Sequence, residues 1–134
     1  MKRLWVDANV FLRFLTGDPP ELAKHSAKLM SRAESGEVVL IVPSLVIAEV
    51  IWVLKSFYRY SLEEIAEVVV PLLSADGVEA EDREVMIQAV TLAHKKNVDF
   101  IDAVLALKAA RHEESVCSFD DDFKRLPAHR VLPG

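Results

Sequence analysis

The stretch Val38-Val-Leu-Ile-Val-Pro-Ser-Leu-Val-Ile-Ala-Glu-Val-Ile-Trp-Val-Leu54 decides the class of fold. It is apolar except at Pro43, Ser44 and Glu49, but it is shorter than the roughly 20 residues of a membrane-spanning helix. Pro43 would interrupt such a helix, and Glu49 would lie unpaired in lipid. The stretch therefore predicts no membrane segment. It predicts a buried strand over 38–42 and a helix over 44–58 with Ser44 as its N-cap.

Strands and helices alternate on both sides of this stretch. Further strands are predicted over 3–6, 78–80, 115–118 and 130–132. Helices are predicted up to residue 15 and over 21–34, 61–73, 82–95, 99–112 and 120–126, and Ser61 with Glu64 forms a capping box. Such alternation predicts an α/β fold with a parallel sheet covered by helices on both faces.

Length and composition agree with one globular domain spanning residues 1–134. The chain is 51% hydrophobic and 28% charged, which argues against disorder. A single cysteine cannot form an internal disulfide, and no amino-terminal signal is evident, so we expect a cytoplasmic protein. The net charge of −5 weakly disfavours binding to nucleic acid, unless the acidic residues are gathered at one place.

Carboxylates occur at two kinds of unusual position. Asp7 and Asp120 directly follow predicted strands, whose carboxyl ends share one edge of a parallel sheet. Glu49 and Asp102 lie inside predicted helices that are apolar on nearly every side, where an unpaired charge is costly. Each has an ordinary interpretation. Asp7, Asp120 and Asp122 can cap helices, Asp99 and Asp102 fit a capping pair, and Glu49 can form a salt bridge.

Taken together, these carboxylates favour a metal site. Like charges brought together repel one another unless a cation neutralises them, and Mg²⁺ prefers oxygen ligands. We therefore predict a Mg²⁺ or Mn²⁺ site, to which Asn9 and Ser44 can add neutral oxygens. Without Asp7, Glu49, Asp99, Asp102, Asp120 and Asp122 the formal charge would be +1, so the acidic total is compatible with a phosphodiester substrate.

No competing catalytic set stands out. His25, His94, His112 and His129 lack metal-ligand spacing and are interpreted as solvated surface. Cys117 lies in an apolar strand and is interpreted as core. There is no glycine-rich phosphate loop. A phosphoacceptor domain is set aside, because Ala8 follows Asp7 where an acidic pair would be needed. Several basic residues could contact phosphate, although scattered basic residues are usually only solvated: Arg13, Lys55, Arg59, Lys95 and Lys96.

Four segments, in this order and spacing, carry a resemblance to a known family. They are Val6-Asp-Ala-Asn-Val-Phe-Leu-Arg13, Pro43-Ser-Leu-Val-Ile-Ala-Glu-Val50, Val98-Asp-Phe-Ile-Asp-Ala-Val104 and Ser118-Phe-Asp-Asp-Asp-Phe123. Over almost its whole length the chain resembles a PIN-domain ribonuclease, and most closely the VapC-like toxins of prokaryotic toxin–antitoxin pairs. The resemblance implies a single PIN-like domain with a five-stranded parallel sheet flanked by helices on both faces.

The resemblance also implies a site and an activity. It assigns catalytic and metal-binding roles to Asp7, Glu49, Asp102 and Asp120, and it places four further residues near the site: Asn9, Ser44, Asp99 and Asp122. The expected reaction is divalent-metal-dependent hydrolysis of RNA phosphodiester bonds by an endoribonuclease. One of the four carboxylates, for which Asp120 is a candidate, would orient or deprotonate the attacking water. Asp121 makes this local assignment ambiguous, and Asp120 is preferred because it comes first after the strand.

Partners are implied by resemblance and by apolar surface. Trp52, Phe57 and the run 68–70 give two predicted helices more apolar surface than one sheet needs. Ordinary core is one interpretation; a homodimer face and a groove for a partner helix are the other. The resemblance implies an RNA substrate, a homodimer and a small cognate antitoxin. The alternative is a catalytically silent PIN-like module that binds RNA or protein for regulation, although all four acids are intact.

Overall fold

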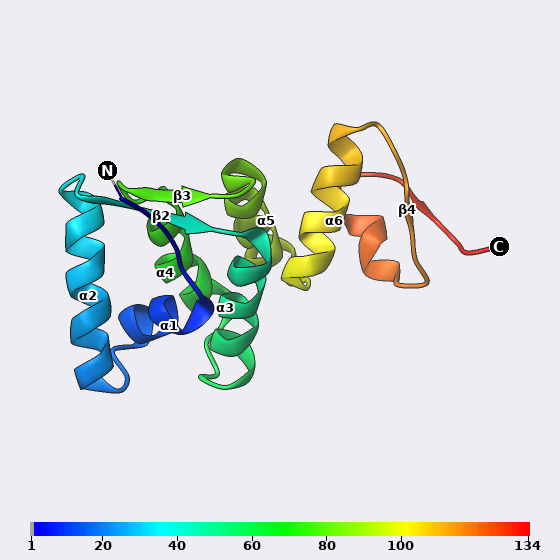
Figure 1. Ribbon diagram of the computed structural model, residues 1–134. Helices are drawn as coiled ribbons and strands as arrows, with labels where there is room; N and C mark the ends of the chain where they lie inside the picture. Colours follow the sequence, from blue (N-terminus) through cyan, green and yellow to red (C-terminus); the bar gives the residue numbers. More distant parts are fainter. Residues whose placement is uncertain (1) are drawn as a thin grey trace. The chain divides into compact units, whose positions relative to one another are not determined.

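The computed structural model describes residues 2–134, and the chain divides into two compact units. The first unit ends at Arg83, and the second comprises Glu84–Gly134. Figure 1 gives the order and labels of the elements along the chain. Within residues 2–134, every helix is too short or too polar to cross a membrane.

The first unit contains three strands and four helices in alternating runs. In chain order they are β1 (Lys2–Trp5), α1 (Ala8–Thr16), α2 (Pro20–Glu34), β2 (Val38–Val42), α3 (Ser44–Ser56), α4 (Leu62–Ser74) and β3 (Val78–Ala80). The capping box that opens α4 is confirmed, because Ser61 Oγ accepts from Glu64 N while Glu64 Oε1 accepts from Ser61 N. Helix α1 ends at Gly17, which adopts the left-handed conformation that glycine tolerates best.

The three strands form a parallel sheet in the order β1-β2-β3. Leu4 lies beside Leu40, and Leu40 lies beside Val78. Three consecutive residues of β2, Leu40, Ile41 and Val42, are buried. Because successive side chains of a strand point to opposite faces, both faces of β2 are covered, as the alternation of elements predicted.

Helices and sheet share one apolar core in this unit. Phe11 of α1, Leu54 of α3 and Ile65 of α4 are each at most 1% exposed. The turn before β3 passes close to α2, since a Cβ at Gly77 would collide with the backbone carbonyl of Ala33. That approach and its positive φ of 79° require glycine at this position.

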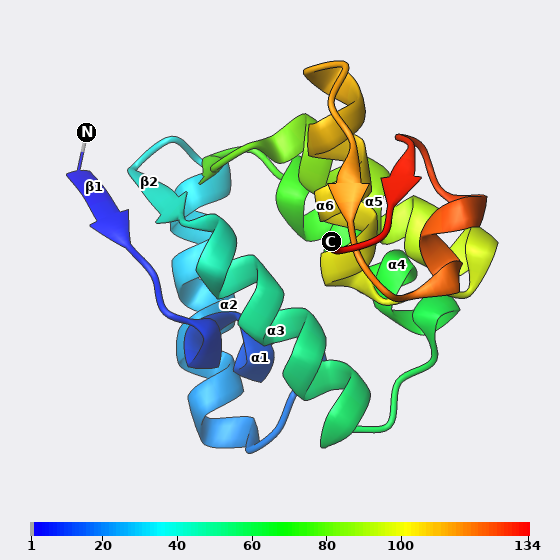
Figure 2. The ribbon, with the colours of Figure 1, turned by 90° about the vertical axis from the view of Figure 1, so that its right-hand side faces the viewer.

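The second unit is built from α5 (Arg83–Lys96, whose first residue ends the first unit), α6 (Phe100–Arg111), β4 (Val116–Cys117), the 3₁₀ helix η1 (Asp121–Arg125) and β5 (Arg130–Val131). Strands β4 and β5 are parallel, with Val116 beside Arg130. Figure 2 shows these two strands side by side, with α6 next to them. Val116, Phe123 and Ala103 are buried, and these side chains belong to β4, η1 and α6.

The prediction of one five-stranded sheet is wrong. The five strands are divided between a three-stranded parallel sheet and a two-stranded parallel sheet. In the described residues β1 pairs with β2 alone, and β4 and β5 pair only with each other. The physical reason is that β4 and β5 are short. Each has two residues, so each offers few backbone N–H and C=O groups that could pair with a further strand. The order of elements along the chain was predicted correctly.

Candidate functional site

Asp7 lies at the start of α1, directly after the first strand. It is the N-cap of that helix, and its Oδ1 accepts a hydrogen bond of 3.3 Å from the backbone N of Val10. The capping interpretation is therefore confirmed. The side chain is nevertheless exposed, and the cap uses Oδ1. A carboxylate that caps with one oxygen can still offer the other to a ligand.

Glu49 does not lie in the apolar interior that the sequence of its helix suggested. It is exposed on α3, on the same stripe as Leu45 and Trp52, which are 83% and 68% exposed. These positions are four and three residues apart and so share one side of the helix. Glu49 and Asn9 both line one cavity of about 440 Å³, so α3 and α1 bring these two predicted site residues to the same hollow.

Ser44 begins α3 without capping it through its side chain. The N-cap is Pro43, and the backbone N of Ser44 donates a hydrogen bond of 2.8 Å to Oε1 of Glu81. Glu81 was missed by the sequence analysis. Its signal was available, because it directly follows the strand Val78–Ala80 and so repeats the placement of Asp7. A distant carboxylate therefore takes the place that a local side-chain cap would occupy, where the helix dipole favours negative charge.

Asp102, in the second unit, has a shifted pKa. Partial burial, which disfavours the charged form, raises the pKa of its carboxyl group above the usual value. The negative charges of Asp99, Asp120 and Asp122 raise that pKa further. Three predicted site residues thus act electrostatically on a fourth. A cation beside Asp102 would relieve this repulsion.

The neighbours of Asp102 are held by short local hydrogen bonds. Asp99 is the N-cap of α6, and its Oδ1 accepts from the backbone N of Ile101 at 2.8 Å. Asp120 is the N-cap of η1, and its Oδ1 accepts from the backbone N of Asp122 at 2.8 Å. The capping interpretation is confirmed for Asp99 and Asp120, and these bonds hold their carboxylates at the helix starts.

Cations already neutralise the next two acids along the chain. Asp121 pairs with Arg130 at 3.2 Å and with Lys124 at 3.4 Å, and Asp122 pairs with Arg125 at 3.1 Å. The Arg130 side chain is only 10% exposed, so its charge is held close to Asp121. Asp121 thus pairs with two cations, although its own side chain is 79% exposed.

The four principal carboxylates are divided evenly between the two units. Asp7 and Glu49 belong to the first unit, whereas Asp102 and Asp120 belong to the second. Within residues 2–134, no three His, Cys, Asp or Glu side chains form a group that could hold a metal ion as they stand. The donor chemistry still fits Mg²⁺ or Mn²⁺, because hard carboxylate oxygens predominate and three of them act on the partly buried carboxyl group of Asp102.

The remaining sequence-based interpretations have mixed outcomes. All four histidines are exposed, as expected. The interpretation of Cys117 as core is wrong, because this residue is exposed. In the two-residue strand β4, Val116 is buried and Cys117 points to the opposite, exposed side. Val69 is core, at 1% exposed, whereas Phe57 is 73% exposed.

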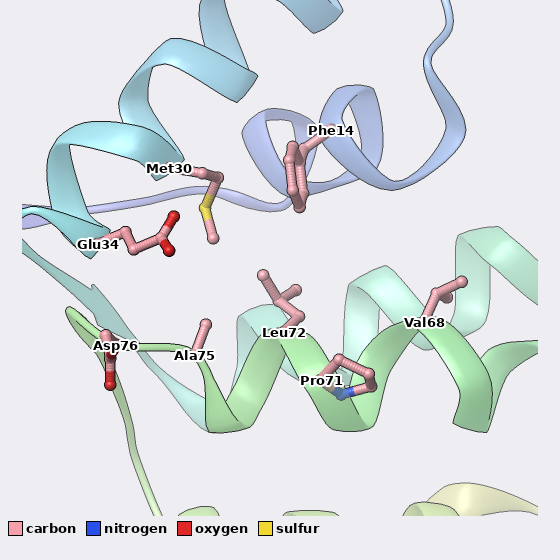
Figure 3. A pocket seen from close by; sticks show the side chains of 8 residues that line it. All are labelled: Phe14, Met30, Glu34, Val68, Pro71, Leu72, Ala75 and Asp76. Atoms are coloured by element: carbon pink, nitrogen blue, oxygen red, sulfur yellow. The ribbon is translucent and has the colours of Figure 1, made fainter.

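A second cavity in the first unit contains none of the predicted site residues. Its volume is about 350 Å³, and Figure 3 shows Phe14, Met30 and Leu72 pointing toward one another across it from α1, α2 and α4. The carboxylate of Glu34 also turns toward this space, while Asp76 points away from it. Its lining is mainly apolar and carries no cluster of acids.

The comparisons with known proteins agree with the α/β fold. Residues 4–128 match the PIN domain family, and the chain belongs to that family. A particular relative is a VapC ribonuclease of Aquifex aeolicus (strain VF5), which is 30% identical over 129 residues. The match covers 96% of this chain and 95% of the relative. The resemblance that the four segments indicated is thus confirmed.

Proposed function

We propose that this protein is a divalent-metal-dependent endoribonuclease that hydrolyses RNA phosphodiester bonds and acts as the toxin of a toxin–antitoxin pair. The observation that carries the proposal is that Asp99, Asp120 and Asp122 lie near enough to Asp102 for their charges to raise its pKa, in addition to the effect of its partial burial. Full-length similarity to a VapC ribonuclease supports the reaction class.

In this proposal Asp7, Glu49, Asp102 and Asp120 hold Mg²⁺ or Mn²⁺, directly or through water. Asn9, Ser44, Asp99 and Asp122 support them. A bound divalent cation would supply a water of lowered pKa and would neutralise charge on the phosphoryl oxygens.

The chain's own residues contribute position and proton transfer. The caps formed by Asp7 and Asp120 hold those carboxylates at helix starts. Asp120 is the candidate to orient or deprotonate the attacking water, since its Oδ1 alone is used in the cap. Asp121 is not assigned this role, because its carboxylate is paired with Arg130 and Lys124.

The test is cleavage of a mixed RNA pool by the pure protein with Mg²⁺, with Mn²⁺ and with EDTA. Wild-type protein is expected to cut only when a divalent metal is present. The double variant Asp7→Asn, Asp102→Asn should lose cleavage by at least about 100-fold. Cleavage that persists in EDTA or in the double variant would overturn the proposal.

Partners form a further part of the proposal. We expect a homodimer and a small cognate antitoxin that inhibits cleavage. Light scattering after size-exclusion chromatography tests the first expectation. Co-expression with the product of an adjoining small gene, followed by the RNA assay, tests the second. A catalytically silent regulatory module would instead bind RNA or protein without cutting under any metal condition.

A further inference from the structure

We propose that the 440 Å³ cavity between α1 and the carboxyl-terminal half of α3 binds one unpaired RNA base by aromatic stacking, with Arg13 contacting the adjoining phosphate. The inference rests on the proposed ribonuclease function, because it assigns a substrate subsite next to Glu49. It uses residues of the first unit only.

The lining of the cavity combines polar and aromatic side chains. Asn9 and Glu49 line it together with Trp52, Phe57 and Tyr58. A volume of this size lies within the range of sites that bind small organic ligands. A ligand in this cavity would therefore share its walls with Glu49, a proposed metal ligand, and with aromatic rings.

Two of the aromatic side chains in this lining are open to solvent. Trp52 is 68% exposed and Phe57 is 73% exposed, although both are large apolar side chains whose exposure to water is unfavourable. The ring of Phe57 meets that of Tyr58 edge to face, with centroids 5.0 Å apart and an interplanar angle of 77°. In that geometry one ring presents its edge, so a flat face remains available. Bases of single-stranded nucleic acid stack on such faces.

Arg13 supplies the positive charge. Its Nη1 donates to the backbone O of Asp18 at 3.3 Å and to Tyr58 Oη at 3.4 Å. These bonds hold the guanidinium at the cavity wall while using one of its nitrogens. A guanidinium has five N–H donors and matches the geometry of phosphate oxygens.

The combination favours RNA over a protein partner as the occupant. An apolar protein surface would need the aromatic rings but not the anchored arginine beside them. Single-stranded RNA needs both, since its bases stack while its phosphates seek cations. The position next to Glu49 then places the stacked base close to a proposed metal ligand.

The test reads stacking through Trp52 without cleavage. Trp5→Phe leaves Trp52 as the single tryptophan, and Asp120→Asn in the same background prevents cutting. An eight-nucleotide single-stranded RNA is titrated in Mg²⁺, beside an abasic chain with the same number of phosphates. We expect the intact RNA to quench Trp52 fluorescence and to bind roughly 10- to 100-fold more tightly than the abasic chain.

Variants separate the two contacts. Trp52→Ala and Phe57→Ala should each weaken RNA binding roughly 10-fold or more, read by anisotropy of labelled RNA. Arg13→Gln should reduce the salt dependence of binding by about one phosphate contact. Leu22→Ala is the control, because Leu22 is 50% exposed and lies outside the cavity. It should leave binding unchanged.

Hydrolysis of bis(p-nitrophenyl) phosphate in Mn²⁺ separates the proposed nuclease function from the proposed base-stacking site. This substrate carries no nucleobase, so its hydrolysis reports the proposed metal site, and the control Leu22→Ala should hydrolyse it at the wild-type rate. Failure of the wild-type protein to hydrolyse either substrate would overturn the proposed function alone. Equal binding of intact and abasic RNA would overturn the stacking site. So would a Trp52→Ala variant that keeps its RNA affinity but loses self-association, because the face would then be a protein interface.

Discussion

The backbone N of Ser44 donates a hydrogen bond of 2.8 Å to Oε1 of Glu81, 37 residues further along the chain. This bond joins the start of α3 to the residue that follows β3, whose own N–H donates to the carbonyl of Val42 at 2.9 Å. The start of the helix that carries Glu49 is therefore fixed to the carboxyl ends of two neighbouring strands.

Glu81→Ala should lower the free energy of unfolding by about 1 kcal/mol, the usual effect of losing a helix cap. Glu81→Gln keeps an oxygen acceptor and should lose less. Urea denaturation followed by circular dichroism measures both variants. Equal losses would show that the charge, rather than the hydrogen bond, stabilises the start of α3.

Asp102→Asn should raise the free energy of unfolding of the metal-free protein at pH 7. The raised pKa of Asp102 means that the folded state binds its proton more tightly than the unfolded state does. Stability is therefore highest when Asp102 is protonated, and it falls as the pH rises from the usual value of 3.8 through the raised value. Asparagine cannot ionise, so Asp102→Asn avoids this loss of stability. The difference in free energy of unfolding between the variant and the wild type should therefore disappear in acid, where Asp102 is protonated.

Urea denaturation in EDTA between pH 3 and pH 8 measures this effect. None of these variants changes Arg125, so its ion pair with Asp122 is the same in every sample. Asp121→Asn is the matched control, because it removes a carboxylate paired with Arg130 and should leave stability unchanged or reduce it by less than about 1 kcal/mol. An Asp102→Asn variant that is less stable than the wild type at every pH would contradict the assignment.

Divalent metal should stabilise the folded protein. A ligand that binds only the folded state at 100 times its Kd adds about 2.7 kcal/mol to the free energy of unfolding. Mn²⁺ is expected to raise the Tm of the wild type and to have a much smaller effect on Asp102→Asn. Differential scanning fluorimetry with Mn²⁺ and with EDTA measures both. Equal shifts for the two proteins would place the metal elsewhere.

Gly77→Ala should destabilise the first unit more than Gly36→Ala does. Both glycines have positive φ, 79° and 83°, so either substitution costs about 1 to 2 kcal/mol of backbone strain. Only at Gly77 would the added Cβ also meet the carbonyl of Ala33, whereas nothing lies within 4 Å at Gly36. Overpacking of this kind adds about 1 to 3 kcal/mol. Identical midpoints of urea unfolding would contradict the close approach of β3 to α2.

Local features of the fold were predictable from the sequence. These features depend on residues close together in the sequence. They are the Ser61–Glu64 capping box, the strand over 38–42, and the helix caps formed by Asp7 and Asp120. The division of the strands into two sheets was not predictable, because it depends on which short strands pair over long separations.

Burial of individual site residues was the weaker part of the prediction. Helix α3 is apolar on nearly every side, and that composition concealed the exposed stripe that carries Glu49 and Trp52. The roles of Glu81 and Arg130 depend on contacts with distant segments, at Ser44 and Asp121 respectively. Nothing in the sequence around either residue marks its partner.

The most direct measurement is the rate of RNA cleavage in Mn²⁺ by three single variants, one from each unit and one control. Glu49→Gln and Asp102→Asn should each lose at least about 100-fold in rate. Asp121→Asn should stay within a few-fold of the wild type, because Arg130 and Lys124 already neutralise that carboxylate. Full activity in either of the first two variants, or a loss in Asp121→Asn as large as theirs, would contradict the proposed site.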